Sequence, residues 1–430
     1  MLKTMPCYQR KTYPVSITEI NTRTLMQMTF EPRAIHGVDN GMKGFMYNEV
    51  YDFAKLRQGF YDAKHGKFHN PAENKFEIRL LEALVILSDK LRDKTYTADQ
   101  TTRFKVYSPK VRDVETNSFK DKVVLHSLCD NVLYPAIQPS FIYDNYASQV
   151  GKGRAFGLDR LAGFMRHYFF SRKAKNEREL RDAGLPLIKV EDGHYADGWV
   201  LKCDIRKYFA NIKHDLVKQM VRRYVDDEDT LWLLDTIIDQ VSDPGLPIGF
   251  QTSPLLSLML LNDFDHMVKE RLHIRYYGRY ADDFYLIHED KAYLQYCLKE
   301  IRKYLAKYGL ELNEKTHIFP LKNGIDFLGF HTYLTDTGKV VQKVRKRSKD
   351  NVRRKLKKMK KKLDAGEITM EKINEFYTSW RAYVSSGDTY HLLQKMDTIY
   401  NSLFNQTENG GETSVLYQTG RKHGSCDHSA

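Results

Sequence analysis

The hydrophobic positions of this 430-residue chain recur at spacings that predict both helices and strands. After Pro71, apolar residues at helical spacing predict an amphipathic helix. These residues are Phe76, Leu80, Leu84, Leu87 and Leu91. Apolar runs predict strands at residues 200–205, 274–277 and 284–287. A further helix is predicted from Pro254, with Ser253 as its N-cap, to about Leu272. Paired strands combined with such helices indicate an α+β protein.

Two adjacent carboxylates lie between the last two predicted strands. Tyr280-Ala281-Asp282-Asp283 forms the turn of the predicted hairpin, which places both acids at its tip. Carboxylates this close repel one another unless a cation neutralises them, and oxygen ligands favour Mg²⁺, an ion suited to phosphoryl transfer to nucleotides. The alternative is an ordinary polar turn, because Asp is a favoured turn residue.

Two other segments have nearly the same sequence as this turn but are not flanked by strands on both sides. The prediction of a metal site therefore depends on the flanking strands and not on the four residues alone. Residues 224–227, Tyr-Val-Asp-Asp, follow the helical spacing of Leu216 and Met220 and have no strand after them. They predict an exposed helix end. Residues 195–198, Tyr-Ala-Asp-Gly, place a single acid in a polar loop.

Other candidate residues follow in a fixed order along the chain. Asp204 ends an apolar run and precedes the aromatics Tyr208 and Phe209. Residues 247–254, Pro-Ile-Gly-Phe-Gln-Thr-Ser-Pro, come between the two acidic strands. Lys315 is expected on a strand edge, and residues 327–330, Phe-Leu-Gly-Phe, on a short apolar turn.

This order resembles motifs A to E of reverse transcriptases, over about residues 76–390. Residues 105–112 and 119–124 resemble the part of the fingers that grips the incoming triphosphate. Residues 141–148 and 151–154 resemble an element of bacterial reverse transcriptases. The resemblance implies an RNA-directed DNA polymerase, a nucleotidyltransferase with the right-hand α+β fold. Its parts are fingers, a palm of antiparallel sheet with helices on one face, and a helical thumb.

The residue at position 248 narrows the resemblance, because Ile248 stands where most retroviral and intron enzymes have Gln. An apolar residue there resembles the diversity-generating retroelement enzymes and the bacterial "unknown group" reverse transcriptases that act in phage defence. Ser253-Pro254 departs from the Ser-Gln that usually ends the box in diversity-generating enzymes. The resemblance therefore favours a stand-alone antiphage enzyme that copies a dedicated, structured non-coding RNA into cDNA. The alternatives are a diversity-generating or group II intron type of reverse transcriptase and, from another class, a catalytically idle RNA-binding protein.

The resemblance also implies roles for single residues. Asp204, Asp282 and Asp283, with the Ile205 carbonyl, would hold two Mg²⁺ ions, with Mn²⁺ as the alternative metal. Asp204 and Asp282 would do most of the coordination, with Asp283 more peripheral. Lys315 would protonate the leaving diphosphate.

Nucleotide binding is expected at a second set of residues. Tyr208 matches the aromatic that closes on the ribose 2′-carbon and selects dNTPs, and Phe209 is the expected core member of the pair. Arg and Lys on one strand face can contact a triphosphate. The nucleotide-binding residues predicted are Lys110, Arg112, Tyr208, Phe209, Gly249 and Gln251.

Almost all of the net charge of +13 lies in one segment. Residues 343–363 contain 13 Lys or Arg against one acid, Asp350. Val352, Leu356, Met359 and Leu363 form a narrow apolar stripe and predict a cationic helix that docks on the body. A solvated charged helix is the alternative. The position after motif E favours a nucleic-acid contact, which we predict at Lys152, Arg154, Arg353, Arg354, Lys357, Lys358 and Lys361.

Composition sets the remaining expectations. Five scattered cysteines without a Cys-x-x-Cys pair support neither a disulfide framework nor a zinc ribbon, and indicate a reducing cytoplasm. No signal core or membrane-spanning run is recognisable, so no membrane role is expected. The predicted parts are an extension (1–50), fingers (51–200) with a polar insertion near 172–198, a palm (201–335), a basic helical thumb (336–405) and a mobile tail (406–430).

Overall fold

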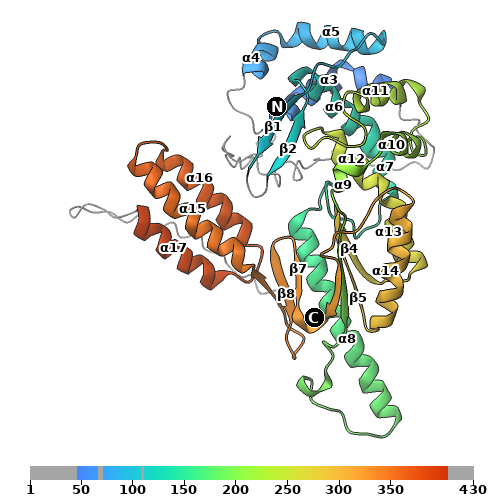
Figure 1. The fold of residues 1–430 in the computed structure, drawn as a ribbon, viewed down its shortest axis with the longest axis vertical. Coiled ribbons are helices and arrows are strands. Elements are labelled where there is room, and N and C mark those ends of the chain that lie inside the picture. The colour runs from blue at the N-terminus through green and yellow to red at the C-terminus, as the bar shows by residue number, and fades with distance from the viewer. Residues whose placement is uncertain (1–45, 66–70, 108–110, 405–430) are drawn as a thin grey trace, which may run out of the picture.

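The computed structural model describes residues 46–65, 71–107 and 111–404. Most of the predicted extension, the tail and Lys110 lie outside the described residues. Figure 1 shows an N-terminal group of helices with a small hairpin, a central sheet, and three C-terminal helices set to one side. The structure is α+β, as the sequence predicts.

The N-terminal group surrounds one large apolar core. Helix α6 (Phe119–Leu128) is buried along its whole length and packs against α3 (Phe53–Lys64). The helix predicted from Pro71 is in fact two helices, because the backbone leaves the helical region at Arg79. The other elements are α2 (Asn48–Tyr51), α4 (Pro71–Ile78), α5 (Leu80–Arg92), a π-helix (Cys129–Leu133) continuing into α7 (Tyr134–Ile137), and the antiparallel hairpin of β1 (Thr102–Val106) and β2 (Arg112–Thr116).

The central sheet is antiparallel, in the order β4-β5-β3-β6. It consists of β3 (Trp199–Asp204), β4 (Tyr276–Tyr280), β5 (Asp283–His288) and β6 (His317–Pro320). The hairpin predicted at the acidic turn is therefore confirmed, with β4 and β5 as its strands.

Helices cover both faces of this sheet, although the sequence predicts helices on one face only. Side chains alternate along a strand, so Leu201 and Cys203 enter the core beneath α13 and α14, whereas Val200 enters the core beneath α8. Asp204 alternates with Val200 and therefore lies on the α8 face. The helices are α13 (Asn262–His266), α14 (Lys291–Ala306) and α8 (Arg154–Asp182).

Three details differ from the sequence prediction in the segments around the sheet. Helix α12 (Thr252–Leu260) begins one residue before Ser253, so Ser253 is not its N-cap, and the predicted single helix is interrupted at Leu261 before α13 and a π-helix at Met267–Arg271. The first part of the polar insertion is the end of α8, which Figure 1 shows extending beyond the sheet. The sequence predicts that residues 224–227 end a helix, but Asp227 instead caps the start of the next one, α11 (Glu228–Ile238). Its carboxylate accepts a hydrogen bond from the Thr230 N–H (2.9 Å).

The C-terminal helices form their own small core. Val352 and Leu356 of α15 (Lys346–Asp364) are buried in one cluster with Trp380 of α16 (Met370–Val384), which confirms the predicted apolar stripe. A three-stranded sheet leads into this bundle. The remaining elements are β7 (Ile325–Phe327), β8 (Phe330–Leu334), β9 (Val340–Val344), α9 (Tyr208–Asn211), α10 (His214–Val221), α17 (Tyr390–Phe404) and 3-10 turns at Gln138–Ser140, Glu191–Gly193 and Leu321–Asn323. The boundaries between fingers, palm and thumb stay predictions.

Candidate active site

The ends of β3 and β5 bring the predicted acids together. Asp204, the last residue of β3, is the direct cross-strand partner of Asp283, the first residue of β5. The Ile205 N–H donates to the Asp282 carbonyl oxygen (3.1 Å), which fixes the backbone next to Asp204 against the turn. Ile205 therefore lies directly beside Asp282, just past the end of β3.

The Asp282 carboxyl has a raised pKa. Burial and, after it, the negative charge of Asp204 raise the pKa of this carboxyl from its ordinary value of 3.8 to about 6. The positive charges of Arg112 and Lys202 act in the opposite direction. Asp204 and Asp282 are thus close enough to repel one another, and bringing their carboxylates together has an electrostatic cost that a cation would remove.

Lys202 contacts the third acid and was not expected from the sequence. Its ammonium forms an ion pair with Asp283, and its side chain is 14% exposed. Burial lowers the pKa of Lys202 to about 8, opposed by the charges of neighbouring acids. Lys202 lies two residues before Asp204, hence on the same face of β3; that alternation is the sequence signal that could have identified it.

The resemblance implies two Mg²⁺ ions held by three carboxylates and the Ile205 carbonyl. In the part of the chain that the structure describes, no group of three or more His, Cys, Asp or Glu side chains is placed to hold one ion. Asp283 is engaged by Lys202, whereas Asp204 and Asp282 interact with one another. Two repelling carboxylates beside a backbone carbonyl are a donor set that suits Mg²⁺. The residues therefore fit a divalent cation at Asp204 and Asp282.

The predicted nucleotide contacts lie on two elements that meet. Arg112 begins β2, is half-buried, and its charge reaches Asp282. Gly249 has φ +140°, and a Cβ there would lie 2.5 Å from the Glu115 carbonyl oxygen of β2. This close approach needs glycine. Gln251 is half-buried and directly precedes α12. Gly249 therefore packs against the strand that carries Arg112.

The two aromatics after Asp204 have the opposite burial from the one predicted. Tyr208 is the core residue, 2% exposed, and its hydroxyl donates to the Ser257 carbonyl oxygen (2.5 Å). Phe209 is half-buried and packs at the edge of the same core. The prediction that Phe209 is the core member is wrong, because the Tyr208 ring turns toward α12.

Lys315 lies in an exposed turn before β6 instead of on a strand edge. Its N–H donates to the Asn313 side chain (3.1 Å), and its carbonyl oxygen contacts His317 Nδ1 (2.6 Å). The Asn313 N–H donates in turn to the Asp204 carbonyl oxygen (2.7 Å). Lys315 is thus connected to the Asp204 strand through Asn313, whose side chain accepts from Lys315 and whose N–H donates to Asp204.

The basic helix α15 presents part of its charge to solvent. Arg354, Lys357, Lys358 and Lys361 are exposed, and Arg353 is half-buried, 3.9 Å from Asp350. Other cations on α15 are engaged within the protein: Lys360 with Asp364 (2.7 Å), Lys362 with Glu367 (3.0 Å) and Lys355 over the Phe376 ring (3.9 Å).

Lys152 and Arg154, predicted to bind nucleic acid, make contacts inside the protein. The Lys152 ammonium donates to the carbonyl oxygens of Tyr143 (2.9 Å) and Asn145 (3.1 Å). The Arg154 guanidinium stacks on the Tyr383 ring (3.8 Å) and donates to the Tyr383 carbonyl oxygen (3.1 Å). The structure therefore favours positioning roles for both over direct phosphate contacts.

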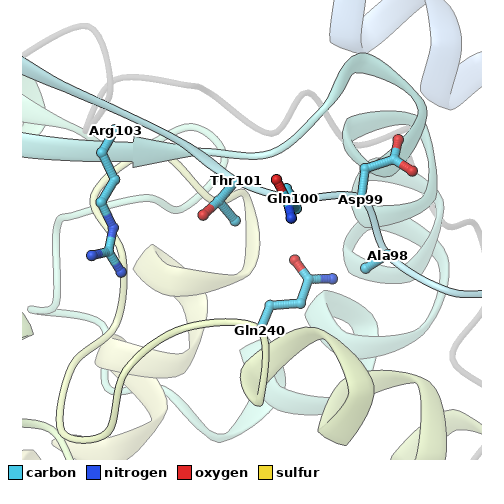
Figure 2. A pocket seen from close by; sticks show the side chains of 6 residues that line it. All are labelled: Ala98, Asp99, Gln100, Thr101, Arg103 and Gln240. Atoms are coloured by element: carbon cyan, nitrogen blue, oxygen red, sulfur yellow. The ribbon is translucent and has the colours of Figure 1, made fainter.

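A polar depression of about 440 Å³ lies at the base of the β1–β2 hairpin. Figure 2 shows Gln240 pointing toward the segment that precedes β1. None of the predicted site residues lines it. The lining residues are Ala98, Asp99, Gln100, Thr101, Arg103 and Gln240.

The family described as "Reverse transcriptase (RNA-dependent DNA polymerase)" matches residues 165–332, which include Asp204, Asp282 and Asp283. The chain carries a reverse transcriptase domain. The protein is 26% identical to Protein YkfC of Escherichia coli K12 over 304 residues, 59% of this chain and 72% of that protein. It is 33% identical to the Retron Ec73 reverse transcriptase of Escherichia coli over 98 residues, 20% of this chain and 31% of that protein.

Two telomerase structures are similar at 14% identity. One is apo telomerase from Candida tropicalis (TM-score 0.38; 57% of this chain, 49% of that chain). The other is telomerase from Candida albicans with a TWJ fragment of telomeric RNA (TM-score 0.41; 73% and 56%). The chain thus spans about half the length of the telomerases it matches.

The sequence matches confirm the resemblance to bacterial reverse transcriptases of the unknown-group kind. The family match supports the predicted enzyme class, RNA-directed DNA polymerase, for the matched domain at residues 165–332. In the described residues, no helix has both the length and the apolar character needed to cross a bilayer.

Proposed function

We propose that this reverse transcriptase domain extends a DNA strand on an RNA template by two-metal nucleotidyl transfer at Asp204 and Asp282. The observation that carries the proposal is the pairing of β3 with β5, which sets Asp204 opposite Asp283 and joins Ile205 to Asp282 by a backbone hydrogen bond (3.1 Å). Divalent ions bound there would polarise the α-phosphate and lower the pKa of the primer hydroxyl.

The surrounding residues have separate roles in this proposal. The Ile205 carbonyl completes the donor set, and Asp283, held by Lys202, is peripheral. Arg112 binds the triphosphate, since a guanidinium offers bidentate contacts and its charge already reaches Asp282. Lys110 joins it from the same segment, Gly249 and Gln251 line the nucleotide pocket, and Lys315 donates a proton to the departing diphosphate.

The exposed face of α15 holds the template–primer duplex. Arg354, Lys357, Lys358 and Lys361 are exposed on the side of α15 opposite the buried Val352 and Leu356. Phosphate contacts by such side chains supply sequence-independent affinity that weakens with salt. Arg353 takes part from the edge of this face.

We further propose that the template is a dedicated, structured non-coding RNA, that the cDNA made from it acts in bacterial antiphage defence, and that the enzyme works in the cytoplasm. Similarity to a retron reverse transcriptase supports this proposal. The alternatives are a diversity-generating or group II intron reverse transcriptase, which would have a variable-protein repeat pair or an intron RNA among its gene neighbours.

The test is to sequence the nucleic acid that copurifies with the protein and to measure dNTP incorporation on the recovered RNA. A single enriched RNA that is copied by the wild type and not by Asp204→Asn supports the proposal. Enriched RNA without incorporation would instead identify an idle RNA-binding protein.

A further inference from the structure

A fully buried ion pair lies directly behind the acidic turn. Arg279 of β4 and Asp265 of α13 both have side chains that are 0% exposed. Arg279 Nε donates to Asp265 Oδ1 (2.7 Å) and Nη2 donates to Oδ2 (2.5 Å). The Tyr277 hydroxyl donates to the same Oδ1 (2.5 Å). Every charged atom of the carboxylate therefore has a partner, as a buried pair requires.

The third donor of Arg279 reaches the turn itself. Nη1 donates to the Ala281 carbonyl oxygen (3.0 Å). Ala281 has φ +53°, a left-handed conformation that is uncommon for alanine, and it is 4% exposed. Its carbonyl belongs to the peptide that joins it to Asp282. The guanidinium thus holds the peptide group next to the Asp282 Cα, from which the carboxylate side chain projects.

We propose that Arg279 is a positioning residue for catalysis: anchored on Asp265, it holds the Ala281–Asp282 peptide so that Asp282 faces Asp204. This inference rests on the proposed role of Asp282 as a metal ligand. The Arg279 backbone is fixed as well, because its N–H donates to the Asp144 carbonyl oxygen (3.0 Å) and its carbonyl oxygen accepts from the Tyr146 N–H (2.9 Å).

Only arginine suits this arrangement. Its planar fork donates in several fixed directions at once, whereas lysine is a compact charge on a flexible stem. A lysine at position 279 could pair with Asp265 or reach Ala281, and could not reproduce both contacts. The alternative is that the pair only fills the core, in which case apolar replacements would preserve activity.

The experiment compares a variant without the network against one that keeps its essential contact. Arg279→Met with Asp265→Leu and Tyr277→Phe removes both charges and the hydroxyl together, so no charge is left unpaired in the core. Tyr277→Phe alone keeps the contact between Arg279 and Ala281. Folding, kcat, KM for dNTP and the Mg²⁺ concentration for half-maximal activity are measured for both.

We expect the triple variant to lose about 10- to 100-fold in kcat, since a small misplacement of a reacting group costs this much. It should also need more Mg²⁺, with little change in KM for dNTP. Tyr277→Phe should keep the wild-type kcat and Mg²⁺ requirement. A triple variant with wild-type kcat and Mg²⁺ requirement would overturn the proposal.

Arg279→Lys provides the second test should the triple variant not fold, because it retains a charge opposite Asp265. It should fold with reduced kcat and a raised Mg²⁺ requirement, and wild-type values would again overturn the proposal. Asp204→Asn separates the two claims. Activity in Asp204→Asn would refute the proposed site, whereas inactivity there with full activity in Arg279→Lys would refute only the role of Arg279.

Discussion

Asp204 and Asp283 are direct partners across the β3–β5 ladder, the last residue of one strand opposite the first residue of the other. Lys202 lies on the same face and contacts Asp283. A register shift of one residue would move these side chains to opposite faces of the sheet. The acids are therefore brought together by the pairing register, and each prediction about them depends on it.

Removing the acids of the turn should abolish polymerisation. We expect Asp282→Asn with Asp283→Asn to reduce dNTP incorporation at least about 1,000-fold, because the lost metal ligands supply several kcal/mol of transition-state stabilisation. Asp226→Asn with Asp227→Asn is the matched control, since asparagine can still cap α11 at position 227. Similar losses in the two double variants would refute the site.

The raised pKa of Asp282 predicts opposite pH effects on the free protein and on metal binding. Between pH 3.8 and about 6 the folded protein binds more protons at Asp282 than the unfolded chain, so this contribution to the free energy of unfolding falls as pH rises. Mg²⁺ binds the ionised carboxylate, so its stabilising effect should grow as pH rises through about 6. Melting temperatures with and without Mg²⁺ test this, and Asp282→Asn should lose most of the difference.

The sequence predicts that Tyr208 selects the sugar, but its ring is buried against α12. We therefore expect the neighbouring, half-buried Phe209 to take that role. Phe209→Ala should raise ribonucleotide relative to deoxyribonucleotide incorporation by roughly 10- to 100-fold, because it opens space beside the sugar. Tyr208→Ala should instead destabilise the fold by about 3 to 5 kcal/mol, since its ring is buried. Single-nucleotide extension gives the ratio independently of the active fraction. If only Tyr208→Ala changed the ratio of ribonucleotide to deoxyribonucleotide incorporation, Tyr208 and not Phe209 would be the sugar-selecting residue.

Duplex binding should depend on the exposed lysines of α15. Replacing Lys357, Lys358 and Lys361 by Gln should weaken binding and flatten the plot of log affinity against log salt by about 2 to 3 units, at close to one unit per phosphate contact. Lys360→Gln with Lys362→Gln is the control, because both lysines pair within the protein. Circular dichroism checks folding. Equal slopes for the triple variant and the wild type would mean that these lysines face only solvent.

Gly249→Ala should destabilise the protein by about 1 to 3 kcal/mol, because its Cβ would meet the Glu115 carbonyl oxygen and its φ is unfavourable for alanine. Gly163 of α8 has open space around it. Gly163→Ala should therefore be neutral or stabilising by up to about 1 kcal/mol. Urea unfolding measures both, and equal stability of the two variants would contradict this packing.

The sequence by itself determined the parts of this protein that local patterns encode. Apolar runs predicted β3 and the β4–β5 hairpin with its acids, and the helical stripe of Val352 and Leu356 predicted a docked basic helix. The ordered motifs predicted the reverse transcriptase domain. These signals lie within short stretches of chain, where residue spacing alone sets the conformation.

Only the tertiary structure decided how distant residues meet. Lys202 forms an ion pair with Asp283 because β3 and β5 pair in one particular register. Tyr208 is buried against α12, where its hydroxyl donates to the Ser257 carbonyl oxygen. Helix α8 covers the second face of the sheet, and the Arg154 guanidinium stacks on the Tyr383 ring. Each of these contacts joins segments whose proximity no local spacing encodes, so the direction in which a side chain points was fixed by packing and not by the pattern around it.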